Sequence, residues 1–136
     1  MAWRACGPIE ANRMRAALIV LLMLATTPAW AEWVKLSEND KAAFYFDPAT
    51  IGKDGNTRRV LALQDLKARD LEGNHSRQVY FEYRCEEERY RMLFFSLHSG
   101  PMATGDILFS KSDPTEWDNV AAGTAGKVIL KHVCAR

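Results

Sequence analysis

The sequence predicts an α+β fold, in which an antiparallel sheet of about six strands, connected as a meander, carries a short helix and a C-terminal helix. Apolar and polar residues alternate with a period of two between positions 33 and 110, as they do in half-buried strands. Turn-forming residues separate these runs at short intervals. After position 124 the spacing becomes helical, and one arc then carries Ile129, Leu130, Val133 and Cys134.

Residues 1–31 have the features of a secretion signal. Arginines precede an apolar run at residues 16–25, and Ala29-Trp30-Ala31 places small residues at the two positions that a signal peptidase reads. The run is shorter than the roughly 20 apolar residues that a membrane-spanning helix needs. We therefore expect cleavage before Glu32, which leaves residues 32–136 as one domain. A translation start at Met14 would give the same mature chain.

Composition and charge narrow the class of protein. The chain has 18 Lys plus Arg residues and 17 Asp plus Glu residues, and both signs are interspersed. Nucleic acids and anionic membranes are usually bound by a basic patch, which this pattern lacks. No cysteine stands at the expected cleavage point, so we expect no lipid anchor. The sequence predicts a soluble exported domain without stable membrane insertion.

The strands follow from the alternation and from the turns between them. We expect strands at residues 33–37, 42–46, 57–67, 76–85, 89–98 and 105–110. Asp54-Gly55 and Gly73-Asn74 supply turn residues that tolerate positive φ. In the fourth run Val79, Phe81, Tyr83 and Cys85 share one face, and Gln78, Glu82 and Arg84 share the other. Cys85 is therefore expected on the core side. The fifth predicted strand, residues 89–98, is apolar and is expected to be a central strand of the sheet.

Two helices are expected after the last of these strands. Asp113-Pro114-Thr115-Glu116 combines a capping Asp, a Pro at the first helical position and a Glu at the third. This pattern predicts a short helix that carries Trp117 and Val120 and ends near Gly123. The helical spacing of residues 124–136 predicts the C-terminal helix, which should lie on the sheet.

The cysteine count predicts a disulfide. Cys6 is removed with the signal, and the exported chain keeps Cys85 and Cys134. In an oxidising compartment a single bridge is the simplest pairing. A redox or nucleophilic cysteine usually needs a Cys-x-x-Cys pair or a positively charged helix start, neither of which is visible. The bridge would join the C-terminal helix to the sheet.

The residues that usually carry chemistry form no recognisable site. His75, His98 and His132 lack metal-ligand spacing, and the first two are expected to be solvated turn residues. Glu86-Glu87-Glu88 is expected to form a solvated hairpin turn, because three consecutive side chains cannot converge on one point in a strand. The serines lack a Gly-x-Ser-x-Gly elbow. We expect no metal, no cofactor and no enzymatic activity.

A binding surface is the remaining functional hypothesis. Arg84, Arg89, Tyr90 and Arg91 cluster around one predicted hairpin, where they could project to solvent together and contact a protein partner. Most other aromatic side chains are expected in the core. An apolar outer strand could also pair with a second copy, which would make a homodimer.

The sequence resembles the surface-adhesin protein E family of Gram-negative bacteria in five short motifs that occur in the same order. They are Trp33-Val34, Tyr45-Phe46-Asp47-Pro48-Ala49-Thr50-Ile51, Ser76 before a strand that ends at Cys85, Trp117 followed by Val120, and Val133-Cys134. The resemblance spans residues 32–136. It implies an antiparallel sheet with a C-terminal helix and bridged cysteines, in the periplasm or at the cell surface. It also implies binding to host matrix or serum proteins. A periplasmic role in envelope maintenance is the alternative, and a small hydrolase is a third hypothesis.

Overall fold

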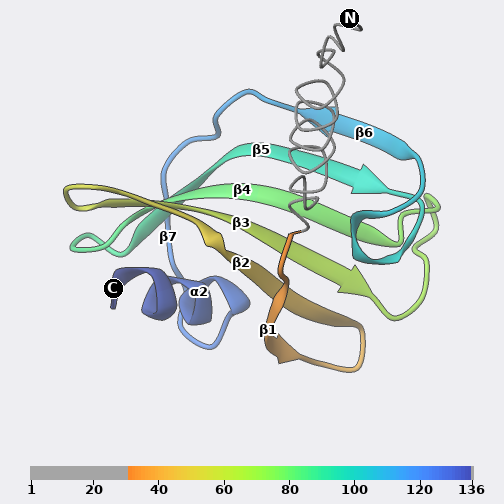
Figure 1. Cartoon of the computed structure of the whole chain (residues 1–136), viewed down its shortest axis with the longest axis horizontal. Coiled ribbons are helices and arrows are strands. Elements are labelled where there is room, and N and C mark those ends of the chain that lie inside the picture. Colours follow the sequence, from red (N-terminus) through yellow and green to blue (C-terminus); the bar gives the residue numbers. More distant parts are fainter. Residues whose placement is uncertain (1–30, 136) are drawn as a thin grey trace, which may run out of the picture. The chain divides into compact units, whose positions relative to one another are not determined.

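The computed structural model describes residues 31–135, so the predicted signal segment lies outside the described residues except for Ala31. The strands are β1 (Val34–Glu38), β2 (Ala42–Asp54), β3 (Thr57–Leu66), β4 (Ser76–Arg84), β5 (Arg89–His98), β6 (Ile107–Lys111) and β7 (Asp118–Asn119). The helices are the 3₁₀ helix η1 (Pro101–Ala103) and the α-helix α2 (Ala125–Cys134) (Figure 1).

The sheet is an antiparallel meander in the order β1-β2-β3-β4-β5-β6. The six strands of this meander and their order confirm the prediction, and the short β7 joins the same sheet by pairing with β5. Strand β5 is central because it has neighbours on both sides. Val79 illustrates the register, since it lies opposite Ala62 of β3 and Phe95 of β5. Gly55 has a φ of 58°, which is the positive value that the β2–β3 turn needs and that glycine adopts without a steric penalty.

Strand β2 is longer than predicted because it passes Pro48 through a bulge. Its pairing with β3 shifts between Asp47 and Gly52 and then continues to Asp54. The Thr50 hydroxyl donates to the Asp47 carbonyl oxygen at 2.7 Å and accepts the Leu61 amide hydrogen at 2.9 Å. This side chain replaces part of the ladder that a proline interrupts, so the strand resumes beyond it.

The prediction of a short helix after Asp113 is wrong. That segment is extended, and the Thr115 amide donates to the Met92 carbonyl oxygen at 2.9 Å. The Met92 amide in turn donates to Thr115 Oγ1 at 3.0 Å, and β7 follows by pairing with Arg89 and Tyr90. Strand β6 pairs only with the far end of β5, so the near end leaves backbone groups for this segment to bind. These hydrogen bonds outweigh the capping pattern, and the short helix of the fold is η1.

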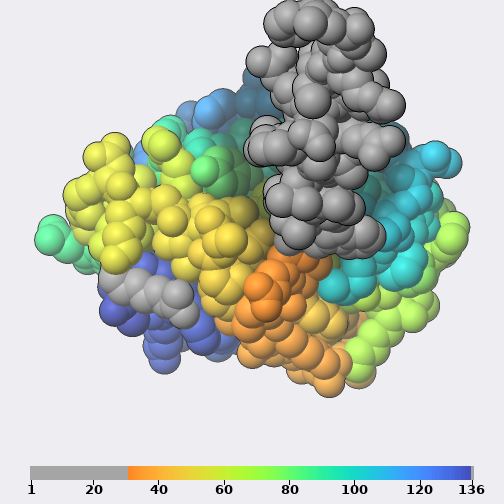
Figure 2. Space-filling view, viewed as in Figure 1, coloured from red at the N-terminus to blue at the C-terminus, as the bar shows by residue number. Residues whose placement is uncertain are grey.

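The main core lies between the sheet and α2. Its buried members are Phe46, Val60, Ala62, Tyr83, Ile129, Leu130 and Val133. Helix α2 begins after Thr124, whose hydroxyl oxygen accepts the Lys127 amide hydrogen at 3.3 Å. It packs mainly against β1, β2 and β3, and Figure 2 shows the blue C-terminal segment beside the yellow β2–β3 region.

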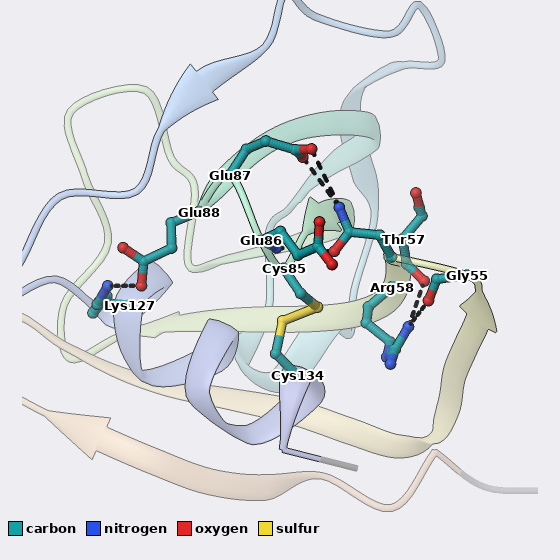
Figure 3. The surroundings of a disulfide bond; sticks show 10 residues. Gly55, Thr57, Arg58, Cys85, Glu86, Glu87, Glu88, Lys127 and Cys134 are labelled. Carbon is teal, nitrogen blue, oxygen red and sulfur yellow. Dashed lines mark hydrogen bonds and ion pairs between the residues drawn. A yellow bond between two sulfur atoms is a disulfide. The ribbon is translucent and has the colours of Figure 1, made fainter.

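The predicted disulfide is confirmed. Cys85 and Cys134 are bonded with their Cα atoms 5.7 Å apart, although 49 positions separate them in sequence. Cys85 directly follows β4, and Cys134 ends α2 (Figure 3). The bridge therefore fixes the end of the helix to the sheet, as the two apolar patterns predict.

Candidate functional site

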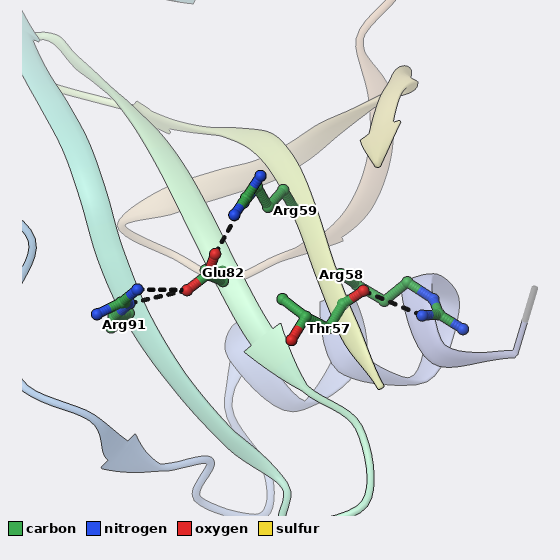
Figure 4. Close-up of polar contacts among 5 residues, drawn as sticks. All are labelled: Thr57, Arg58, Arg59, Glu82 and Arg91. Atoms are coloured by element: carbon green, nitrogen blue, oxygen red, sulfur yellow. Dashed lines mark hydrogen bonds and ion pairs between the residues drawn. The ribbon is translucent and has the colours of Figure 1, made fainter. Parts of the chain in front are cut away.

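A buried carboxylate organises the face of the sheet that points away from α2. Glu82 is 3% exposed, although it lies at a position that the alternation assigns to the polar face. Its cross-strand neighbours are Arg59 of β3 and Arg91 of β5. Arg59 Nε lies 2.7 Å from Oε2, and a terminal guanidinium nitrogen of Arg91 lies 2.7 Å from Oε1 (Figure 4). One carboxylate therefore holds two guanidinium groups across three strands.

The electrostatics keep Glu82 ionised. Burial alone would raise its pKa, but the hydrogen bonds and charges of Arg59 and Arg91 outweigh burial and hold the pKa below its usual value. Glu82 in turn raises the pKa of Arg59, mainly through their hydrogen bond. The Arg59 and Arg91 side chains remain 47% and 31% exposed, so they keep donors that face solvent.

Trp117 completes this face. The guanidinium carbons of Arg84 and Arg91 lie 4.1 and 4.6 Å from the centroid of its ring, which is within cation–π distance. Pairing of β7 with β5 brings Trp117 here, because Asp118 lies opposite Tyr90. Arg89 lies opposite Arg84 in the β4–β5 register and therefore shares the same face. We call Arg59, Arg84, Arg89, Arg91 and Trp117, with Glu82 beneath them, the arginine–tryptophan face.

The four residues predicted for partner binding do not all lie together. Arg84, Arg89 and Arg91 share the arginine–tryptophan face, but Tyr90 points to the opposite side because side chains alternate along β5. The Tyr90 ring lies 5.9 Å from that of Phe81 and 6.2 Å from that of Tyr83, beside the core. Tyr90 is therefore not exposed in common with its neighbours.

The binding surface predicted from the sequence leaves out three members of this face. Arg59 belongs to it through the register of β3 with β4, which no local pattern specifies. The sequence predicts a helix around Trp117, and only the extended path of its segment places the ring over β4 and β5. Glu82 carried a usable signal, since its alternation with Tyr83 already placed it beside Arg84 on the face away from the helix.

The three consecutive glutamates form the predicted hairpin turn. They lie between β4 and β5 and are exposed. Glu87 accepts a hydrogen bond from Asn56 Nδ2 at 3.2 Å, and Glu88 pairs with Lys127 Nζ at 2.5 Å (Figure 3). Their carboxylates spread apart and form no shared acid–base or cation site.

His98 is not the solvated turn residue that was predicted. It is 5% exposed, and its Nε2 lies 2.8 Å from Oγ of Ser96, which is 1% exposed. The chain after β5 folds back, so that the Ser76 hydroxyl donates to the Gly100 carbonyl oxygen and covers this end of the strand. Burial lowers the pKa of His98. Within the described residues its Nδ1 has no hydrogen-bond partner, so the pair lacks the third group of a catalytic triad.

Neither a metal site nor a membrane-spanning helix is found within residues 31–135. No group of three or more His, Cys, Asp or Glu side chains in this range is arranged to hold a metal ion. No helix in this range is both long and apolar enough to span a bilayer.

Comparisons with known proteins show what this arrangement is similar to. A model of the surface-adhesin protein E family matches residues 33–135. The crystal form II structure of Haemophilus influenzae protein E matches with a TM-score of 0.60 at 14% identity, over 80% of this chain and 91% of the other. Protein E from non-typeable Haemophilus influenzae matches with a TM-score of 0.56 at 14% identity, over 80% and 79% of the two chains. A search of curated proteins finds no match.

Proposed function

Because the chain belongs to the surface-adhesin protein E family, we propose that it is a non-catalytic domain that binds a protein partner through its arginine–tryptophan face. Family membership identifies it as an exported protein of the periplasm or cell surface. The partner that fits the family is a host matrix or serum protein. The charge of the face selects a partner surface that presents carboxylates.

The observation that carries this proposal is the packing of Arg84 and Arg91 against the ring of Trp117. Tryptophan and arginine contribute most of the binding energy at many protein interfaces. Glu82 fixes Arg91 from below, so less side-chain entropy is lost when a partner binds. Arginine also presents donors in a fork that matches a carboxylate, which gives the face both affinity and orientation.

The Ser96–His98 pair supports a non-catalytic role. Both side chains are almost fully buried, so a substrate cannot reach the hydroxyl oxygen. Burial also lowers the pKa of His98, which favours the neutral form of the ring. The pair is better explained as the internal hydrogen bond that satisfies a buried serine at the end of β5.

The experiment is a binding measurement on the mature protein against a panel of purified matrix, serum and bacterial envelope proteins. We expect Trp117→Ala to weaken capture about tenfold or more, as truncation of a central interface tryptophan does. Replacing both Arg84 and Arg89 with Gln should weaken it as well. Capture by the wild type should decline as salt is raised, because the partner contacts are charged.

Arg69→Gln is the matched control, because Arg69 is an exposed arginine in the loop between β3 and β4 and lies outside the face. It should bind like the wild type. Thermal melting of each variant separates loss of binding from loss of fold. If folded Trp117→Ala and the double arginine variant capture the partner as well as wild type, the arginine–tryptophan face is ordinary surface. Capture of an envelope protein alone would favour the periplasmic alternative.

A further inference from the structure

A groove lies on the opposite side of the sheet, next to the start of α2. Its volume is 270 Å³, and its walls come from β2, β3, β4, β5 and the first turns of the helix. Most of the lining is apolar, including Phe44, Ala62, Val79, Phe81, Met92 and Ile129. Because α2 is short and packs mainly on β1, β2 and β3, it leaves this part of the sheet open.

Arg77 is the only permanently charged residue among those that line the groove. Its guanidinium carbon lies 5.0 Å from the Phe95 ring centroid, and a terminal nitrogen donates to the Met92 sulfur at 3.2 Å. A thioether is a weak acceptor. The Nε atom is buried, and within residues 31–135 it has no hydrogen-bond partner. No ion pair of Arg77 with a carboxylate occurs in this described range.

Within the described residues, Arg77 therefore lacks the carboxylate partner that would neutralise its charge and accept its Nε hydrogen bond. An unpaired buried donor is unfavourable, and burial also lowers the pKa of Arg77, since the charged form has lost solvent. A carboxylate would satisfy Nε and a terminal nitrogen together in a bidentate pair. The cation is fixed at a wall of an apolar space, so its natural complement has an anionic head and an apolar tail.

We propose that the groove binds a medium-chain carboxylate, with the acyl chain along the apolar lining and the head group paired with Arg77. At roughly 30 Å³ for each water-sized group, a volume of 270 Å³ holds about nine non-hydrogen groups, close to the size of octanoate. The charge of Arg77 thus sets the ligand's head group, and the volume of the groove sets the size of its tail. The groove and the arginine–tryptophan face lie on opposite sides of the sheet, so this inference does not rest on the proposed function.

The test is titration calorimetry of the mature protein with octanoate, octan-1-ol and octylammonium. Octanoate should bind at least about tenfold more tightly than octan-1-ol, and octylammonium should bind weakest, because only the carboxylate pairs with Arg77. Arg77→Met keeps the length and apolar character of the side chain without its charge. In this variant octanoate should bind no better than octan-1-ol.

Two further variants keep the test decisive. Arg69→Met removes an exposed arginine outside the groove and should bind octanoate like the wild type. A Cβ at position 126 would meet no atom closer than 3.7 Å, so Gly126→Leu can fill the groove from the helix. It should abolish binding of both octanoate and octan-1-ol while thermal melting shows a folded protein. Equal affinity of wild type for octanoate and octan-1-ol, or unchanged octanoate binding by folded Arg77→Met, would overturn the proposal.

Discussion

His98 makes stability depend on pH through its burial. Its ordinary pKa is 6.5, and burial lowers that value in the folded protein. Below about pH 6.5 the unfolded chain binds a proton that the folded protein does not bind, so the free energy of unfolding decreases as pH falls. The loss ends below the folded pKa, where both states are protonated. We expect urea denaturation to show this decline between pH 7.5 and 5, and His98→Gln to remove most of it.

Glu82 titrates below the pH range in which His98 is tested, so its protonation does not contribute to the decline assigned to His98. Its folded pKa is lowered from 4.5, so its stabilising contribution is present above about pH 4.5 and disappears as pH falls through the folded pKa. Glu82→Gln should therefore leave the decline between pH 7.5 and 5 intact. A wild-type curve that is flat over that range would show that His98 is not buried as a neutral ring.

At the scale of single residues, the sequence predicts which side of the sheet a side chain lies on better than it predicts whether that side chain is buried. The alternation correctly separates Tyr83 from Glu82 and Arg84. It does not predict that Glu82 is buried, because this depends on Arg59 and Arg91, which belong to neighbouring strands. His98 was missed for a similar reason, since the chain that covers it follows in the next loop. Burial of a polar residue is decided by partners that a local pattern does not contain.

Strand β6 presents an apolar edge, from which we propose that the protein forms a homodimer. Ile107, Leu108 and Phe109 are 63%, 47% and 51% exposed, and β6 ends the meander. An edge strand with unpaired backbone groups and apolar side chains readily pairs with another strand. We expect light scattering to show a concentration-dependent dimer and Leu108→Lys to shift it to monomer. Val34→Lys, on the opposite edge strand, is the control. A wild type that stays monomeric at high concentration would exclude this pairing.

At the scale of elements, a strong hydrophobic periodicity predicts strands and helices well, whereas a capping motif alone predicts a helix poorly. The six strands and the C-terminal helix each combine a period with turns or buried apolar positions. The segment from Asp113 to Gly123 has a capping pattern but only Trp117 and Val120 as apolar anchors, and it forms hydrogen bonds with β5 instead. A tertiary contact that satisfies backbone groups outweighs a helix signal supported by so few buried side chains.

For the whole molecule, the Cys85–Cys134 bridge connects the two layers of a small core. Closing a loop of about 50 residues stabilises a fold by about 4 kcal/mol in the chain-entropy model. We expect replacement of both cysteines with Ala to lower the free energy of unfolding by about that amount, measured by urea denaturation. Reduction of the wild type should have a similar effect.

The double alanine variant should itself be insensitive to reductant, which makes it the internal control for that measurement. Alkylation and mass measurement of freshly exported protein should detect no free thiol before reduction. Unchanged stability after removal of both cysteines would mean that packing of α2 alone holds the helix to the sheet. Two free thiols in exported protein would contradict the bridge.

Whole-molecule architecture follows from the sequence because two periodicities and two cysteines are enough to specify a sheet, a helix and their connection. The functional surfaces do not follow in the same way. The arginine–tryptophan face combines side chains from β3, β4, β5 and the segment before β7. The groove exists because a ten-residue helix covers only part of a wide sheet. Both features depend on register and coverage, which appear only when the chain is folded.

The central claim is that the arginine–tryptophan face contacts a protein partner, and site-specific photocrosslinking tests it most directly. A photoreactive amino acid would replace Glu116, which is exposed and adjacent to Trp117, or Arg69 as the control. Intact cells would be illuminated with and without matrix and serum proteins. We predict a partner adduct from position 116 that is absent from position 69 and is lost when Trp117→Ala is added. Adducts of equal yield from both positions, or from position 69 alone, would contradict the account.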